Sequence, residues 1–218
     1  MNDPAAFIRA QTVIAAPPLV PEVRLHLATE VTPLWRATEA TLADDDVPPP
    51  YWAFAWPGGQ ALARYLLDNP EIVRGRHVLD FASGSGLVAI AAARAGAATA
   101  TAADIDPLAA AAIALNAEAN GATLSIVDED LLDRPGGTWD LVLAGDVCYE
   151  QPMAGRTTAW LRRLAAGGVE VLIGDPGRTY RPTAGLVERA RHVVRTSLDL
   201  ECRERQETVV WQLLPDGG

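Results

Sequence analysis

The sequence predicts an α/β fold in which a mostly parallel sheet of seven strands carries helices on both faces and ends in one antiparallel strand. Three observations lead to this prediction. Short apolar runs alternate with longer helical segments, which is typical of parallel strands joined by crossover helices. A glycine-rich loop joins the first of these runs to a helix within residues 77–93. A charged turn separates the last two apolar runs and indicates a terminal antiparallel hairpin.

Composition limits the class of protein and its partners. A chain of 218 residues suits one α/β domain, and 49% hydrophobic with 21% charged residues is ordinary for a globular protein. The formal net charge is −10, and all 18 basic residues are arginine because the sequence contains no lysine. An acidic surface argues against nucleic acid or an anionic membrane as a partner. We expect a monomer.

The two cysteines, Cys148 and Cys202, are too few for a disulfide framework, and no Cys/His cluster indicates zinc. A reducing compartment is therefore expected. No apolar run approaches the roughly 18 residues of a membrane span. The N-terminus has neither a basic region nor an Arg-rich amphipathic start, so the predicted location is the cytoplasm, or the mitochondrial matrix in a eukaryote.

Residues 1–50 are predicted to be an N-terminal extension of a main domain that spans residues 51–218. The extension contains a predicted short helix at residues 5–12 and a short strand at residues 23–28. Acidic residues followed by prolines predict a stiff linker at residues 44–50.

An unusual aromatic stretch opens the main domain. Four aromatic residues fall between Tyr51 and Trp56, and a Pro-Gly-Gly sequence then leads into a predicted helix at residues 60–68. Our interpretation is that Tyr51 and Phe54 close the end of the sheet. Trp56 is instead expected to form a lid over a cationic cofactor, because an indole face attracts a positive charge.

The glycine-rich loop is the centre of the predicted binding site. An apolar strand at residues 77–81 carries Asp80, and the loop that follows carries Gly84 and Gly86 before a helix begins. Glycines let the backbone approach a ligand, and a helix N-terminus presents unpaired N–H groups. A second apolar run, residues 98–103, ends in Asp104, where an acid can accept both ribose hydroxyls of an adenosine.

The spacing within this loop separates two classes of cofactor. Gly84 opens a G-x-G-x-x-A sequence and Asp104 follows 20 residues later, which would suit a nicotinamide dinucleotide. Three residues, however, intervene between Asp80 and Gly84, and this D-x-x-x-G-x-G form resembles the first motif of class I S-adenosylmethionine-dependent methyltransferases. Their cofactor carries an ammonium and a carboxylate, which suit an acid beside free N–H groups. A dinucleotide-dependent oxidoreductase stays as an alternative.

The rest of the chain supplies the remaining strands and further acids. A helix is expected from Pro107 to Asn120, followed by a third strand at residues 124–127. After that strand we choose Asp130 over Asp128 as the acid that meets the adenine amino group. The other expected elements are strands at residues 139–145, 169–173, 197–202 and 208–214, and helices at residues 153–166 and 186–195.

Asp146 and Tyr149 come directly after the fourth predicted strand. The carboxyl ends of parallel strands meet at one edge of a sheet, so these side chains should face the same crevice as Gly84 and Asp104. The loop at residues 174–178 should lie on the same edge.

Several of these motifs together resemble the seven-β-strand protein lysine methyltransferases. The Trp-Pro-Gly-Gly sequence at Trp56 and the Gly-Asp-Pro-Gly-Arg sequence at 174–178 are specific, whereas the glycine loop indicates only the superfamily. The resemblance implies a Rossmann-like class I methyltransferase fold, S-adenosyl-L-methionine as cofactor, and lysines of a protein, the electron transfer flavoprotein β subunit, as substrate. The segments that carry it are residues 50–62, 80–86, 104–107, 146–149 and 173–178.

The resemblance also implies roles for single residues. Asp146 and Tyr149 match the family's D-x-x-[YF] motif and would frame the methyl-transfer face, as catalytic residues. A departure is the Ala-Ser pair at residues 82–83, which replaces a more glycine-rich loop. The predicted cofactor-binding residues are Trp56, Asp80, Ala82, Gly84, Gly86, Asp104, Ile105 and Asp130.

No histidine falls in the predicted site, so we assign no general base. The hypothesis is that Asp146 orients the substrate amine and that its proton goes to water, which predicts a rate that rises between about pH 7 and pH 9. A methyltransferase acting on a small molecule or on RNA is the alternative on the same scaffold.

Overall fold

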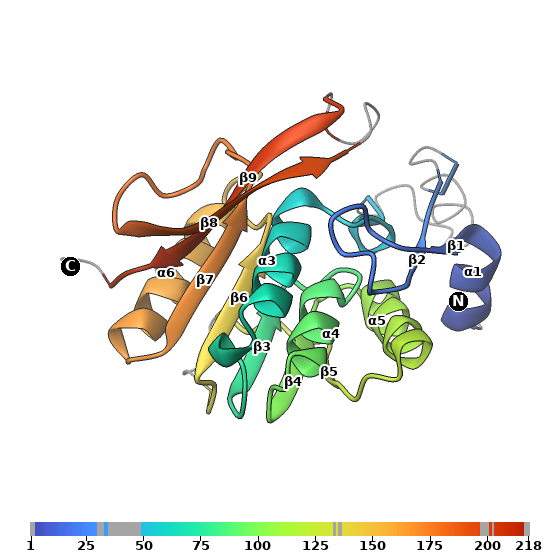
Figure 1. Cartoon of the computed structure of the whole chain (residues 1–218), viewed down its shortest axis with the longest axis horizontal. Helices are drawn as coiled ribbons and strands as arrows, with labels where there is room; N and C mark the ends of the chain where they lie inside the picture. Colours follow the sequence, from blue (N-terminus) through green and yellow to red (C-terminus); the bar gives the residue numbers. More distant parts are fainter. Residues whose placement is uncertain are drawn as a thin grey trace.

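The computed structural model describes residues 3–29, 33–34, 49–132, 134, 137–196, 201 and 203–215. A seven-stranded sheet lies at its centre in the order β5-β4-β3-β6-β7-β9-β8 (Figure 1). The first five of these run parallel, and β9 is antiparallel to both of its neighbours. This confirms the predicted sheet with its reversed last strand. The strands are β3 (His77–Phe81), β4 (Thr99–Ala103), β5 (Ser125–Val127), β6 (Leu141–Gly145), β7 (Glu170–Asp175), β8 (Leu186–Arg195) and β9 (Arg205–Leu213).

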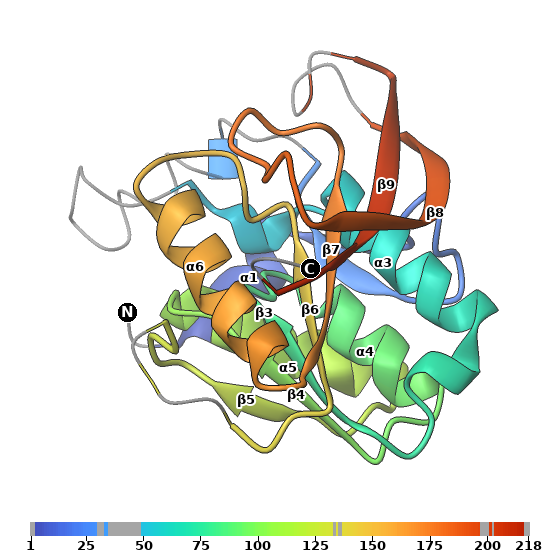
Figure 2. The same cartoon turned by 90° about the vertical axis from the view of Figure 1, so that its left-hand side faces the viewer.

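Helices cover both faces of the sheet, as Figure 2 shows with the sheet nearly edge-on. On one face lie α3 (Pro57–Asp68), α4 (Leu87–Arg94) and α5 (Pro107–Asn120), and on the other lies α6 (Met153–Ala166). Neighbouring residues of a strand point to opposite faces, so in β6 Leu143 joins the core under α3 while Val142 joins the core under α6. The two cores fix the direction of the strands and thus the position of their carboxyl ends.

The N-terminal residues pack onto the main domain. Helix α1 (Pro4–Gln11) contacts α5, and β1 (Val13–Ala15) pairs with β2 (Leu25–Leu27) in a small separate sheet. Buried Asn116 of α5 accepts the backbone N–H of His26 at 2.7 Å. The sequence predicted the helix and the second strand but not β1. Of the predicted linker, residues 44–48 lie outside the described residues.

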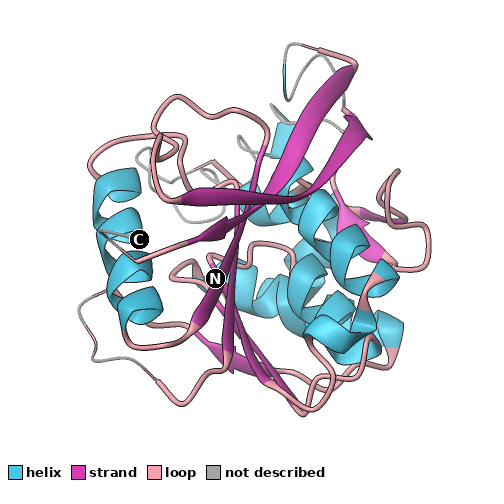
Figure 3. Cartoon of the chain, turned by 60° about the vertical axis from the view of Figure 1, so that its left-hand side comes forward, coloured by secondary structure: helices cyan, strands magenta, loops and turns pink. Residues whose placement is uncertain are grey.

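The predicted helix at residues 186–195 is wrong, because this segment is strand β8. It pairs with β9 over most of its length, with a bulge between Glu188 and Ala190, and forms a long hairpin (Figure 3). The branched Val187, Val193 and Val194 favour a strand, and charged side chains suit the edge of a sheet. The predicted strand at residues 197–202 falls, apart from Glu201, outside the described residues.

Two further short elements are the 3₁₀ helices η1 (Tyr51–Ala53) and η2 (Pro70–Ile72). Within the part of the chain that the structure describes, no helix has both the length and the apolar character needed to cross a membrane.

Candidate active site

The glycine loop has the backbone shape that its sequence predicts. Ala82, Gly84 and Gly86 all have positive φ angles, of 52°, 54° and 81°, and Gly86 precedes the first residue of α4. A Cβ atom at Gly84 would point toward η1, with the Trp52 Cα atom 3.8 Å away and the Tyr51 carbonyl oxygen 3.9 Å away. The loop and η1 therefore lie side by side at the carboxyl end of β3.

Two acids lie beside this loop, at the ends of β3 and β4. Oδ2 of Asp80 accepts hydrogen bonds from the Ser83 hydroxyl at 2.5 Å and the Ala89 N–H at 3.0 Å. Oδ2 of Asp104 accepts the Gly84 N–H at 2.8 Å, and its Oδ1 accepts the Asp106 N–H at 3.1 Å. Within the described residues, neither acid has a basic side chain as a partner.

Burial without a counter-charge changes how these acids ionise. It raises the pKa of Asp80 to about 7, with a further contribution from the negative charge of Asp104, and it also raises the pKa of Asp104. A ligand that brings a positive charge would relieve this cost. An adenosyl sulfonium with an amino-acid ammonium does so, and its ribose hydroxyls can donate to Asp104. The residues present therefore fit S-adenosylmethionine.

The carboxyl ends of β3, β4, β6 and β7 form one rim of the sheet. The glycine loop, Asp80 and Asp104 make up its first half, and its second half lies where α3 begins directly against the ends of β6 and β7. A Cβ atom at Gly58 would lie 2.2 Å from the Gly174 carbonyl oxygen and 2.5 Å from Oδ2 of Asp146. A Cβ atom at Gly145 would lie 2.8 Å from the Gly59 nitrogen. This close approach explains why glycines occur in three separate segments, and it sets the first N–H groups of α3 against Asp146.

Asp146 is almost completely enclosed, with 8% of its surface exposed and a positive φ of 57°. Its Oδ2 accepts the N–H groups of Gly58 at 2.6 Å and Gly59 at 3.2 Å, and its Oδ1 accepts Nη2 of Arg178 at 2.8 Å. Burial raises the pKa of Asp146 to about 6, and Arg178 opposes that rise. A carboxylate has about four acceptor positions, so Oδ1 retains room for one more donor.

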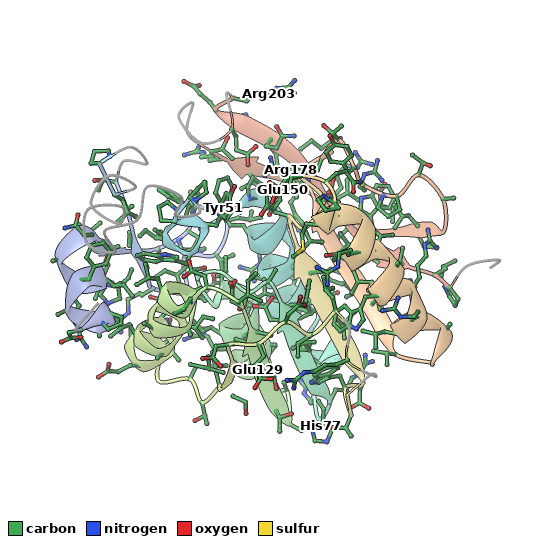
Figure 4. All side chains as sticks on the ribbon, turned by 180° about the vertical axis from the view of Figure 1, so that it is seen from behind. Tyr51, His77, Glu129, Glu150, Arg178 and Arg203 are labelled. Carbon is green, nitrogen blue, oxygen red and sulfur yellow. The ribbon has the colours of Figure 1, made fainter. Side chains whose placement is uncertain are left out.

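An aromatic cluster connects the two halves. The Trp56 indole N–H donates to the Tyr51 carbonyl oxygen at 2.8 Å, and the Tyr51 ring lies 5.8 Å from Trp56 and 5.3 Å from Tyr149. Tyr149 is 39% exposed, and burial of its phenol raises its pKa. Tyr51 thus does more than close the sheet, since it joins the predicted lid to the predicted catalytic tyrosine. Figure 4 shows Tyr51 and Arg178 at one end of the molecule and His77 at the other.

The structure thus brings together most of the predicted site residues, but two of them, Asp130 and Ile105, have exposed side chains. Asp130 is exposed on the loop after β5, where it accepts the Leu132 N–H and pairs with Arg156 at 3.4 Å. Ile105 is 63% exposed. Both remain predictions as cofactor contacts.

Sequence reasoning missed Arg178 as a site residue. Its position in the Gly-Asp-Pro-Gly-Arg sequence, directly after β7, was the available signal. Nothing local predicts its contacts, because Asp146 lies 32 residues and Glu201 lies 23 residues away in the sequence.

Comparison with solved structures supports the fold. The chain is similar to magnesium protoporphyrin IX methyltransferase (ChlM) from Synechocystis PCC 6803 with bound SAH, with a TM-score of 0.52 and 18% identity over 70% of this chain and 80% of that one. It is also similar to the putative RNA methyltransferase PH1948 from Pyrococcus horikoshii, with a TM-score of 0.54 and 12% identity over 83% and 98% of the two chains. The fold is that of class I methyltransferases.

Sequence comparison assigns the family. Residues 61–147 match the family model of ribosomal protein L11 methyltransferase (PrmA). Over 97% of this chain and 87% of the relative, the sequence is 40% identical to electron transfer flavoprotein beta subunit lysine methyltransferase of Xenopus laevis. The Homo sapiens protein of that name is 39% identical over 96% of this chain and 82% of its own length. The chain belongs to the electron transfer flavoprotein beta subunit lysine methyltransferase family, and it is an S-adenosylmethionine-dependent methyltransferase.

Proposed function

We propose that this protein methylates lysine side chains of an electron transfer flavoprotein β subunit and that the rim around Asp146 and Tyr149 performs the transfer. The observation that carries the proposal is the 40% identity over 97% of the chain to a relative named for that substrate. The geometry supports it, because Asp146 and Tyr149 lie beside Trp56 and η1, which face the glycine loop.

Bound S-adenosylmethionine supplies an electrophilic methyl group on a positively charged sulfur. Our proposal gives the chain the task of placing an amine in line with that group, since correct positioning accounts for much of the rate of such a displacement. Asp80 and Asp104 hold the cofactor, with Ala82, Gly84 and Gly86 shaping the loop. Tyr149, whose ring lies 5.3 Å from that of Tyr51, borders the path of the incoming side chain.

The substrate amine must lose a proton before it can react. A free lysine has a pKa of about 10.4, so its neutral form is disfavoured at pH 7 by about 4.6 kcal/mol. All three histidines lie away from the rim: His77 begins β3 at the opposite end, His26 contacts Thr12 and Asn116, and His192 pairs with Thr208 in the hairpin.

Asp146 is also a poor proton acceptor, because three donors already occupy its oxygens. The remaining acceptor position of its Oδ1 can instead orient the amine. We therefore infer that the proton leaves to water before transfer, as the sequence suggested.

The test is methylation of a purified flavoprotein. The enzyme is incubated with S-adenosylmethionine and a recombinant electron transfer flavoprotein, and the β subunit is analysed by intact-mass and peptide mass spectrometry. We expect mass increases of one or more methyl groups on lysine. Because the enzyme contains no lysine, every methyllysine in the mixture belongs to the substrate.

An Asp146→Ala variant and a reaction without the cofactor serve as controls. If the enzyme methylated RNA or a small molecule but left the flavoprotein unmodified, the alternative substrate class would replace the proposed one. The cytoplasmic location and the monomeric state remain predictions.

A further inference from the structure

One arginine connects three parts of the rim. Arg178, which follows β7, donates from Nη2 to Oδ1 of Asp146 at 2.8 Å and to Oε1 of Glu201 at 2.5 Å, and from Nη1 to Oε2 of Glu201 at 3.0 Å. Asp146 follows β6, and Glu201 lies between β8 and β9. The side chains of all three are largely enclosed, with exposed fractions of 20% for Arg178, 10% for Asp146 and 7% for Glu201.

The position of this guanidinium is fixed from two sides. Asp175 Oδ1 accepts the backbone N–H groups of Gly177 at 2.6 Å and Arg178 at 2.8 Å, which holds the turn from which Arg178 projects. The Cζ atom of Arg178 also lies 5.9 Å from the centre of the Trp56 ring. A fixed fork of this kind directs one positive charge to a chosen oxygen, as arginine does better than lysine.

We propose that Arg178 is a positioning residue for methyl transfer, whose guanidinium keeps the Asp146 carboxylate charged and holds it in one orientation against the start of α3. The inference rests on the proposed function of the same rim and adds a residue to it. Neither the cofactor nor the substrate needs to touch Arg178, because it acts through Asp146.

The charges around Asp146 show why such a residue is needed. Glu201 and Asp175 face it with negative charge, while Arg178 and the N–H groups at the start of α3 face it with positive charge. Cys148 is an uncharged titratable neighbour. Even with Arg178 present, burial raises the pKa of Asp146 to about 6. Without Arg178, only the α3 N–H groups would favour the charged form, and Asp146 would be protonated near neutral pH.

Arg181 provides a matched control in the same loop. Its Nε lies 3.5 Å from Oδ1 of Asp175, and its Cζ lies 4.9 Å from the centre of the Trp211 ring. It therefore also combines an ion pair to a buried acid with a contact to an indole. The difference is that Arg181 pairs with Asp175, whereas Arg178 pairs with Asp146.

The first experiment measures the ionisation of Asp146 directly, without any substrate. The side-chain carboxyl carbons of the ¹³C-labelled protein are followed by NMR as the pH is changed, and Asp146 is assigned by its absence in Asp146→Asn. We expect the Asp146 midpoint to move up by at least about one pH unit in Arg178→Met, since an adjacent opposite charge shifts a carboxyl by about one to three units. Arg178→Lys should move it less, and Arg181→Met should change it little.

The Glu201→Gln variant tests the direction in which the pKa of Asp146 moves. It removes a negative charge that raises the pKa of Asp146, so the midpoint should move down, opposite to the Arg178→Met change. If Arg178→Met does not fold, Arg178→Lys and Glu201→Gln still decide the question. An Asp146 midpoint that stays in place in the Arg178 variants, or that moves equally in Arg181→Met, would overturn the proposal.

The second experiment asks whether the charge matters for transfer. With flavoprotein substrate, kcat/KM of Arg178→Met should fall by up to about tenfold for each unit that the Asp146 midpoint rises, and it should recover toward the wild-type value at pH 9. The Kd for S-adenosylhomocysteine should change less than about threefold, because Asp80 and Asp104 are untouched. A loss that persists at pH 9 would indicate structural damage and would contradict the proposed role. Failure of the flavoprotein as a substrate would leave the NMR result standing, so the two proposals fail separately.

Discussion

The two halves of the rim differ in the partners of their buried acids. At the ends of β3 and β4, Asp80 and Asp104 are held by N–H and hydroxyl donors alone, with no basic side chain as partner among the described residues. At the ends of β6 and β7, Asp146 is paired with Arg178 as well as with the start of α3. The first half leaves negative charge for a cationic ligand to neutralise, whereas in the second half the protein supplies a guanidinium, which Asp146 shares with Glu201.

This difference assigns a task to each half. An uncompensated buried acid costs stability in the free protein and recovers that cost when a positive ligand binds. A compensated acid costs less in the free protein and keeps its geometry whether or not a ligand is present. We therefore expect cofactor affinity to depend on the β3–β4 half and the geometry of methyl transfer to depend on the β6–β7 half.

The largest expected effect comes from filling the close contact in the β6–β7 half. Gly58→Ala places a Cβ atom 2.2 Å from the backbone carbonyl of Gly174, which cannot move without shifting β7. Overpacking of this kind costs about 3 kcal/mol, and the melting temperature should fall by roughly 10 °C. Gly59→Ala is the matched control, because its Cβ meets only a Val88 methyl at 3.8 Å; alanine there should be neutral or stabilising by up to about 1 kcal/mol. Equal losses in both variants, measured by thermal unfolding, would contradict the packing account.

The next effect is the pH dependence of the rate. If the lysine proton leaves to water, kcat/KM should rise about tenfold per pH unit from pH 7 to pH 9, because the neutral amine increases in that proportion below its pKa. Steady-state kinetics with the flavoprotein substrate would measure it. A bell-shaped profile centred at about pH 6.5 would instead indicate a histidine base and would contradict the proposed loss of the proton to water.

The β3–β4 half is tested by Asp104→Ala. Loss of two hydrogen bonds to ribose hydroxyls at a charged acceptor should weaken S-adenosylhomocysteine binding about ten- to a hundredfold, or about 1.5–3 kcal/mol. Asp128→Asn, an exposed acid on the same side of the sheet, should leave the affinity unchanged. Isothermal calorimetry distinguishes the two, and unchanged binding in Asp104→Ala would remove that acid from the site.

The smallest expected effect is a gain in stability. The folded-state pKa of Asp80, about 7, lies above its ordinary value of 3.8, so the folded protein binds the extra proton and loses stability as pH rises from about 4 to about 7. Asp80→Asn keeps an acceptor for Ser83 and Ala89 but removes the charge. At pH 8 its free protein should melt at least about 2 °C higher than the wild type, with the advantage disappearing near pH 4.

The same Asp80→Asn variant should bind the cofactor more weakly. A lower melting temperature at pH 8 would show that the Asp80 charge is compensated after all, and the contrast between the two halves would be lost.

Much of the fold could be predicted from local signals. The glycines after Asp80, the apolar runs and the proline that begins α5 indicated β3, α4, β4 and α5 at nearly the observed bounds. The hairpin was harder, because residues 186–195 contain enough charged residues to suggest an exposed helix. Their strand conformation is decided by pairing with β9, which is a long-range effect.

The site likewise contains one part that local sequence signals predict and one part that they do not. Asp80, Gly84 and Asp104 belong to one strand–loop–helix–strand unit, so their spacing in the sequence already defines their arrangement. The contacts of Asp146 with Gly58, Gly59 and Arg178 join segments 88, 87 and 32 residues apart, and no local pattern specifies them. Only the tertiary structure shows that α3 starts against this carboxylate.

The central claim concerns where the cofactor sits, and a crystal structure with S-adenosylhomocysteine tests it most directly. We predict electron density beside the glycine loop and η1, with the ribose at Asp104, the amino group near Asp80 and the sulfur directed toward Trp56 and Tyr149. Density elsewhere, or a sulfur directed away from Asp146 and Tyr149, would contradict the account.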